Sequence, residues 1–107
     1  MMMDKPECKN IVRSVLPAVR ASVATAMHER YGYSQKAIAE RLGVVQVAVS
    51  KYLRGKYSKD ITRLKGYITR NRLSDSIVEK IAKGESRQQI DSDIDALCDR
   101  LVVLNAR

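Results

Sequence analysis

The sequence is poor in aromatic residues. It contains no Trp and no Phe among 107 residues, and its five aromatic side chains are all Tyr. A hydrophobic core must therefore be assembled from Leu, Ile, Val, Ala and Met, a composition that favours packed helices. The length suits a single domain covering residues 1–107, with one modest core and no room for a second, catalytic domain.

Long hydrophobic runs are also missing. No segment approaches the roughly 18–20 apolar residues that span a bilayer, and residues 1–10 lack the apolar core of a secretory signal. Cys8 and Cys98 are the only cysteines, and their separation fits neither a disulfide framework nor a metal-ligand spacing. We expect a cytoplasmic protein without a membrane partner, in which both thiols are buried as small apolar groups.

Groups that carry catalysis are scarce. His28 is the only histidine, and it falls in a helical segment without a paired nucleophile or a carboxylate cluster. The sequence has no Gly-rich phosphate loop and no His/Cys pattern that would hold a metal. It therefore predicts a protein that is not an enzyme and that uses no metal or other cofactor.

Negative charge is scarce in the middle of the chain. The formal net charge of +8 divides into +2 for residues 1–33, +8 for residues 34–72 and −2 for residues 73–107. A merely solvated surface would not concentrate the whole excess in one third of the chain. We therefore expect this third to face the phosphates of a nucleic acid.

Apolar residues recur every three or four positions along most of the chain, which predicts helices. A short helix is expected over residues 6–15. Pro17 cannot continue it without losing a hydrogen bond, but it suits the first turn of a new helix over residues 17–30 that Gly32 ends. The two apolar stripes consist of Ile11, Val12 and Val15, and of Val19, Val23, Met27 and Tyr31.

Two short helices follow in the basic third of the chain. Ser34 is placed to cap a helix over residues 35–42, which Gly43 breaks. A further helix is expected over residues 46–53, closed by Gly55. A weaker helical stripe then appears at Ile61, Leu64 and Ile68.

The acidic third also predicts helices. Ser74 is expected to cap one of them, and Ser86 with Gln89 forms a capping box for an amphipathic last helix over residues 86–105. The seam of that helix has heptad spacing and consists of Ile90, Ile94, Leu97, Leu101 and Leu104. No period-two run predicts a strand. The expected fold class is all-α, a compact bundle of about six or seven helices.

Residues 35–53 are spaced for two helices that cross at a steep angle. Ala39 leaves room where the helices approach, Gly43 takes a turn position that needs positive φ, and Val44 fills the elbow. The positions expected to face the core are Ile38, Leu42, Val49 and either Tyr52 or Leu53.

This segment resembles the helix-turn-helix of phage-repressor-type regulators, the Cro/CI or xenobiotic-response-element family. The likeness is carried by Ser34-Gln35, Ile38-Ala39, Leu42-Gly43-Val44, Gln46, Val49-Ser50, Tyr52-Leu53 and Gly55. Residues 15–21, with Arg30-Tyr31-Gly32, are similar to a group of archaeal transcriptional regulators. The resemblance covers residues 10–57 and implies a lambda-repressor-like DNA-binding domain with its helix-turn-helix at residues 34–54.

The resemblance also implies sequence-specific binding to double-stranded DNA, with the second helix of the motif in the major groove. Gln46 has the amide that reads adenine in a bidentate way, while Ser50 and Lys51 suit a base edge or a phosphate. Gln35 resembles a glutamine that clamps a phosphate at the start of the first helix. The expected base-reading residues are Val45, Gln46, Val47, Ser50 and Lys51. The expected phosphate-contacting residues are Gln35, Lys36, Arg54, Lys56 and Tyr57.

The sequence departs from the family pattern at two places. Val45 stands where such regulators place Ser or Thr to cap the recognition helix, so we expect a frayed or tilted start and a contact of Val45 with a thymine methyl. Some relatives carry an effector-binding domain after this region, whereas this chain ends at Arg107. We expect no dedicated small-molecule effector domain.

A transcriptional regulator is the function that these features favour. An RNA-binding or protein-interaction helix-turn-helix module would use the same fold, and a redox- or metal-sensing regulator would use Cys8 and Cys98 from two subunits. We also expect a homodimer, since one motif reads only a few base pairs and two copies would occupy half-sites about one DNA turn apart. The seam of residues 86–105 is either the dimer contact or packs within its own chain against residues 11–15.

Overall fold

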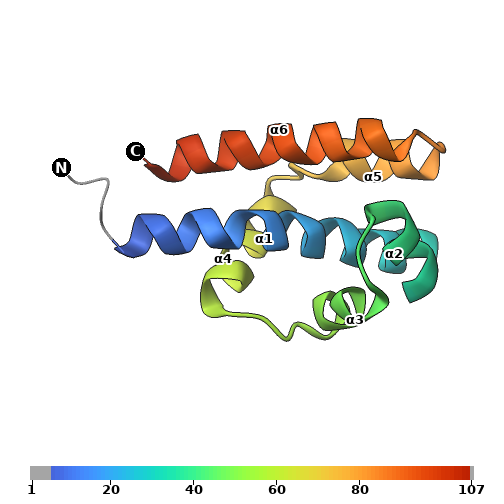
Figure 1. Ribbon diagram of the computed structural model, residues 1–107, viewed down its shortest axis with the longest axis horizontal. Helices are drawn as coiled ribbons and strands as arrows, with labels where there is room; N and C mark the ends of the chain where they lie inside the picture. Colours follow the sequence, from blue (N-terminus) through green and yellow to red (C-terminus); the bar gives the residue numbers. More distant parts are fainter. Residues whose placement is uncertain (1–5, 107) are drawn as a thin grey trace.

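The computed structural model describes the backbone of residues 6–106 and the side chains of residues 13–104. This part of the chain contains six α-helices and no strand, so the predicted all-α class is confirmed (Figure 1). The helices are α1 (Pro6–Tyr31), α2 (Gln35–Leu42), α3 (Gln46–Arg54), α4 (Lys59–Arg70), α5 (Asp75–Ala82) and α6 (Arg87–Ala106). None of these helices is long and apolar enough to cross a membrane.

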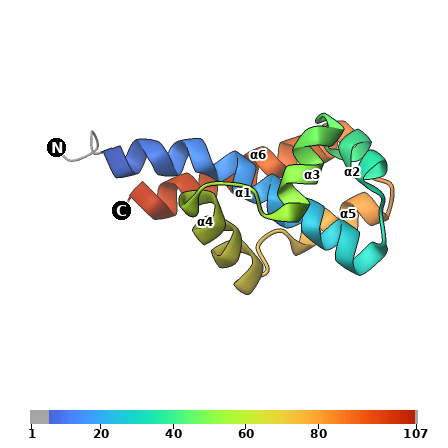
Figure 2. The same cartoon turned by 90° about the horizontal axis from the view of Figure 1, so that it is seen from below.

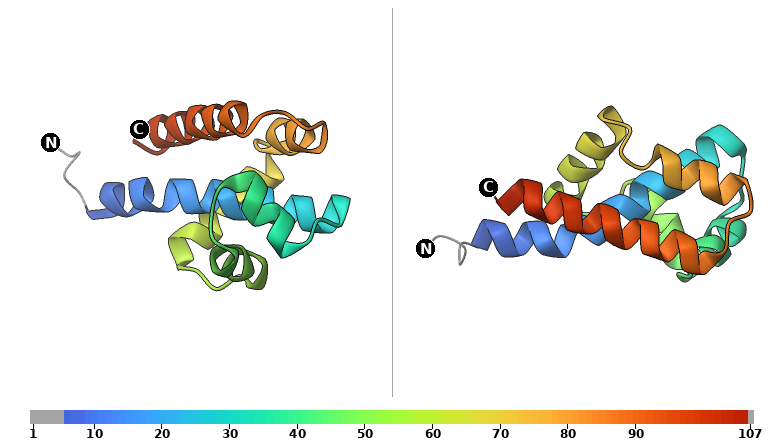
Figure 3. Two further views of the ribbon diagram at one scale, coloured as in Figure 1. Left: turned by 45° about the vertical axis from the view of Figure 1, so that its right-hand side comes forward. Right: turned by 90° about the horizontal axis from the view of Figure 1, so that it is seen from above.

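The long helix α1 is the centre of the fold and contacts all five other helices. α6 runs beside α1 in the opposite direction, while α3 and α4 lie on the other side of α1 (Figure 1). Figure 3 shows the same order from two further directions. Small side chains let these neighbours approach α1 closely. The buried ones are Ala18, Ala21, Ser22 and Ala24.

Pro17 does not separate two helices. The prediction of one helix over residues 6–15 and a second one starting at Pro17 was wrong, because α1 is continuous with Pro17 inside it. Proline in a helix interior removes a hydrogen bond and crowds the preceding turn, at a cost of about 3 kcal/mol. Tertiary packing offsets this cost, since Val15, Ala18 and Val19 on both sides of Pro17 are at most 1% exposed.

The apolar seam of α6 packs inside its own chain. Its buried positions, each at most 4% exposed, are Ile90, Ile94, Leu97 and Leu101. Leu104, the last seam residue, is 49% exposed, and its neighbour Val103 is 55% exposed. The expected partner Val15 is buried, whereas Ile11 and Val12 lie outside the described side chains. Most of the seam is therefore not free to hold a second subunit.

Two ion pairs fix α5 to its neighbours. Arg30 of α1 lies 3.2 Å from Asp75, and Lys80 lies 2.8 Å from Asp93 of α6. The hydrogen bond from Lys80 lowers the pKa of Asp93, and the same bond raises the pKa of Lys80. Because all four side chains are partly exposed, these pairs orient the helices more than they stabilise them.

Two predicted caps differ from expectation. Ser74 precedes α5, but its hydroxyl makes no cap hydrogen bond and instead pairs with Ser22 Oγ at 2.9 Å. The prediction that Ser74 caps α5 was therefore wrong, because two buried hydroxyls satisfy each other. At α6, Gln89 N donates to Ser86 Oγ at 3.2 Å, yet the Gln89 side chain donates to Asp93 rather than returning to Ser86.

Candidate nucleic-acid interface

Helix α2 begins with the cap that the sequence predicts. Gly32 has φ of 70°, which lets the chain leave α1, and Ser34 has the extended backbone of an N-cap. The Ser34 hydroxyl accepts the N–H of Ala37 at 3.1 Å. Gln35 is half-buried and Lys36 exposed in the first turn of α2, where the helix dipole favours an anion.

The turn between α2 and α3 depends on Gly43. Its φ is 69°, a left-handed conformation that strains other residues, and the N–H of Val44 donates to the Ala39 carbonyl at 3.1 Å. A Cβ atom on residue 43 would lie 2.9 Å from Cζ of Arg87, at the start of α6. The turn is therefore fixed by its own backbone and covered by the Arg87 side chain of α6.

Helix α3 has a buried and an exposed side. Val49 is fully buried, and Tyr52 and Leu53 are half-buried against the same core. The predicted base-reading residues lie elsewhere on the helix and at its start. Val45, Gln46, Val47 and Lys51 are exposed, and Ser50 is half-buried.

The start of α3 lacks a side-chain cap, as the sequence predicts. Val45 has the extended backbone of an N-cap, with φ of −78° and ψ of 152°, but no side-chain hydrogen bond. The first turn of α3 is 3₁₀-like, because the Val45 carbonyl accepts the N–H of Ala48 at 3.0 Å and that of Val49 at the longer distance of 3.4 Å.

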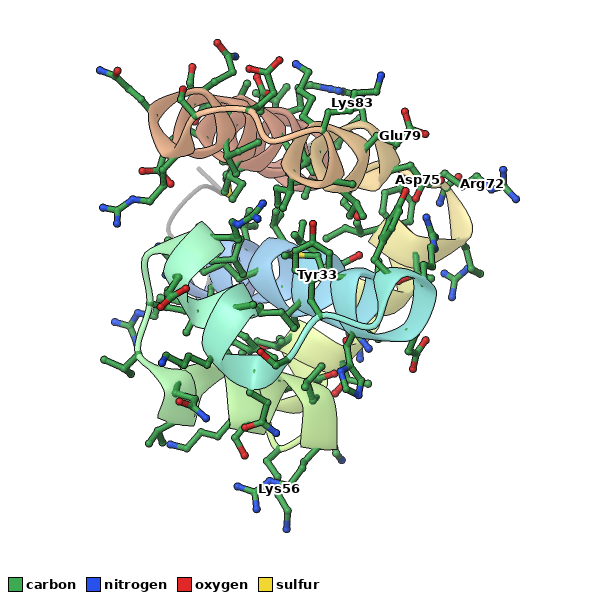
Figure 4. The ribbon with its side chains drawn as sticks, turned by 90° about the vertical axis from the view of Figure 1, so that its right-hand side faces the viewer. Tyr33, Lys56, Arg72, Asp75, Glu79 and Lys83 are labelled. Carbon is green, nitrogen blue, oxygen red and sulfur yellow. The ribbon has the colours of Figure 1, made fainter. Side chains whose placement is uncertain are left out.

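Arg54, a further candidate residue, is the last residue of α3, and two more candidates follow this helix. Gly55, with φ of 71°, ends α3 and turns the chain into the loop before α4. Arg54 and Lys56 are exposed and Tyr57 is half-buried. Figure 4 shows Lys56 at the opposite end of the molecule from Lys83, which follows α5. Neither Arg54 nor Lys56 forms an ion pair with a described residue.

One exposed cation of the motif, Arg41, contacts another helix of its own chain. Arg41 Nη1 donates to the carbonyl oxygen of Ile81 at 2.9 Å, and its guanidinium lies 5.4 Å from the centre of the Tyr33 ring. Tyr33 points from the segment before α2 toward the C-terminal helices (Figure 4). Its backbone carbonyl accepts a hydrogen bond from Nδ1 of His28 at 3.0 Å, which gives the only histidine a structural contact.

Cys98 is an unreactive type of cysteine. It is half-buried on α6, and burial raises the pKa of its thiol to about 11, with Asp95 and Asp99 adding to the effect. The thiolate is the form that binds metals and reacts, and little of it exists at neutral pH. Cys8 lies outside the described side chains, among which no cluster of three metal-ligating residues occurs.

A shallow polar hollow of about 210 Å³ lies between α1, α4 and α5. Small-molecule sites are mostly apolar with a few polar groups, whereas the wall of this hollow is mainly polar. It includes Ser22, Thr25, Lys65, Thr69 and the Arg30–Asp75 pair. That the chain carries no dedicated effector domain stays a prediction.

Residues 29–69 match the protein family described as Helix-turn-helix, which is of the Cro/CI type. The match is less than half of the chain; it begins in the last turn of α1, contains α2 and α3, and ends within α4. No match is found among curated proteins or solved structures. The six-helix fold thus contains a helix-turn-helix, with α2 as its first helix and α3 as its second.

Proposed function

We propose that this chain is a transcriptional regulator that binds double-stranded DNA sequence-specifically through α3. The observation that carries the proposal is the exposed amide of Gln46 between two exposed valines. Val45 and Val47 are 70% and 65% exposed, although valine is usually buried. An A·T pair offers a thymine methyl beside the N6 and N7 atoms of adenine in the major groove, and apolar groups next to an amide match that edge.

The residues around α3 support the same proposal. Gln35 and Lys36 open α2, Arg54 ends α3, and Lys56 and Tyr57 follow it. Side chains at such positions bind phosphates and so fix a recognition helix in the groove without reading sequence themselves. The cations among them have no ion pair with a described residue, which leaves their charge for an external anion.

We also propose that the regulator binds DNA as a homodimer. Since most of the α6 seam is buried within the chain, we assign the contact to the exposed end of α6 at Val103 and Leu104. Leu104→Asp should convert a micromolar dimer into a helical monomer in sedimentation experiments. Leu97→Asp is unsuitable as a test, because Leu97 is 3% exposed and a buried charge there would unfold the chain. A folded wild-type monomer at micromolar concentration would contradict the dimer.

A salt titration tests the proposed function. The affinity of the wild type for a random duplex should fall steeply with KCl concentration, because phosphate contacts release counterions. The bound duplex is then challenged with unlabelled duplex and with structured RNA. We expect duplex DNA to compete better. Better competition by the RNA would identify an RNA-binding module, and an affinity independent of salt would contradict the phosphate contacts.

A redox- or metal-sensing regulator is a further alternative. It would need the Cys98 thiolate, which the raised pKa of this thiol disfavours. Metal analysis of the freshly purified protein tests it directly, since stoichiometric zinc or iron would support a metal sensor.

A further inference from the structure

A row of exposed residues follows helix α4, outside both sets of residues proposed to contact DNA. Successive members are four, four and three positions apart, so they share one side of the helix. The opposite side holds Leu64 and Ile68 in the core. The members of this row, called here the α4 stripe, are Lys59, Arg63, Tyr67 and Arg70, and all four are exposed.

The α4 stripe is not neutralised by acids of its own chain. None of its cations forms an ion pair with a described residue, and Asp60, the single acid of α4, is half-buried beside it. Lys59 and Arg63 are four positions apart, a spacing at which like charges destabilise a helix slightly. α6 shows the ordinary solvated pattern instead, because Arg87 is followed four positions later by Asp91 at 3.8 Å.

Gly66 adds a second local cost on the same side of α4. Glycine in a helix interior is about 1 kcal/mol less favourable than alanine. Here it leaves room for the side chain of Arg70, since a Cβ atom on residue 66 would lie 3.3 Å from Arg70 Nη1. The Arg70 guanidinium therefore lies back along the helix, over the position that a Cβ atom on residue 66 would take.

The α4 stripe begins where the loop after α3 ends. Lys59 is the first residue of α4, and the first turn of this helix lies on the same side of the molecule as α3 (Figure 1). Figure 2, which views the molecule from that side, shows the loop after α3 leading to the start of α4. The basic surface that starts at Lys56 thus continues along a helix of 12 residues, about 18 Å in length.

We propose that the α4 stripe binds the phosphate backbone of DNA flanking the base pairs read by α3, an inference that rests on the proposed function. Its guanidinium and ammonium groups contact phosphates without reading bases, and the phenol of Tyr67 supplies one more donor. The stripe raises the affinity for all duplex sequences alike and lengthens the footprint on one side of the motif.

The test compares two double variants of the full chain that remove the same charge. Arg63→Gln with Arg70→Gln alters the stripe, while Lys83→Gln with Arg100→Gln alters exposed cations of the C-terminal region. Binding to a random duplex of about 25 base pairs, more than two helical turns, is followed by fluorescence anisotropy over a KCl series. Each phosphate contact contributes about 0.9 to the magnitude of the slope of log affinity against log salt. We therefore expect this magnitude to be roughly 1 to 2 smaller for the stripe variant than for the wild type.

The charge-matched control should keep the wild-type slope. Arg63→Lys with Arg70→Lys should keep most of it too, since the charges remain. Equal slopes for the stripe variant and the wild type would overturn the inference, as would an equal loss in the control, because the effect would then follow net charge alone. Failure of the proposed function has a different signature, in which the wild type itself does not bind the duplex.

Discussion

The guanidinium of Arg41, in α2, donates a hydrogen bond to the backbone carbonyl of Ile81, in the last turn of α5, at 2.9 Å. The same guanidinium lies over the ring of Tyr33. Arg41 therefore joins the helix-turn-helix to α5, in addition to the cover that Arg87 of α6 gives to the turn. Arg41 thus contacts its own chain, unlike Lys36, Arg54 and Lys56, which have no ion pair with a described residue.

Arg41→Ala should lower the free energy of unfolding by about 1 to 2 kcal/mol, because it removes a charged hydrogen-bond donor from the Ile81 carbonyl, which keeps only the N–H of Gly84 among the described donors. Urea denaturation measures this change. Lys36→Ala, an exposed position on the same helix, is the matched control and should stay within about 0.5 kcal/mol of the wild type. Equal effects of the two substitutions would show that the contact with Ile81 contributes nothing.

Val45→Ser should stabilise the protein by about 1 kcal/mol. The backbone angles of Val45 are close to those of Ser34 and Ser58, whose hydroxyls do cap α2 and α4. Ser34→Ala supplies the reverse comparison and should lose a similar amount. Thermal unfolding of both variants measures these changes. If Val45→Ser had the stability of the wild type, the first amides of α3 would gain nothing from a side-chain cap.

Gly43→Ala and Gly55→Ala should each cost about 1 to 2 kcal/mol, because both glycines have positive φ. A Cβ on residue 55 meets nothing within 4 Å, whereas one on residue 43 meets the Arg87 guanidinium. That side chain is 62% exposed and can move aside, so the two costs should agree within about 0.5 kcal/mol. A much larger loss at Gly43, reversed by Arg87→Ala, would show that Arg87 is held rigidly over the turn.

The Cys98 thiol should react slowly. With a pKa near 11 instead of 9.0, its thiolate fraction at pH 8 is about a hundredfold lower than that of an ordinary thiol. A Cys8→Ser variant isolates Cys98 for reaction with an aromatic disulfide, and denatured protein gives the reference rate. The raised pKa also predicts that stability falls as the pH rises from 9 toward 11, because only the unfolded thiol then ionises. Equal rates in the folded and denatured protein would contradict the shift.

The helix-turn-helix could be predicted because its geometry is decided locally. Gly32, Gly43 and Gly55 all have φ near 70°, and Ser34 caps α2 with its own hydroxyl. Each of these features depends on residues within one or two turns of the chain. Periodicity likewise identified the buried residues of α6, since an amphipathic helix must bury its apolar face.

The errors arose where a contact from a distant part of the chain decided the outcome. Pro17 remains inside α1 because buried residues on both sides hold the helix. Ser74 does not cap α5 because Ser22, 52 positions away, accepts or donates its hydrogen bond. The α4 stripe was not identified from the sequence, because only the total charge of residues 34–72 was considered. Its spacing of four, four and three positions is nevertheless present in the sequence.

The central claim is that Gln46 reads a base pair from the first turn of α3. Selection of bound duplexes from a random pool, with the wild type and with Gln46→Ala, tests this claim most directly. We predict one enriched site for the wild type and a relaxed preference at a single base pair for the variant. Its affinity for the selected duplex should weaken by about 1 to 3 kcal/mol, while that for random duplexes stays nearly constant. Equal losses on selected and random duplexes, or no enriched sequence for the wild type, would contradict the account.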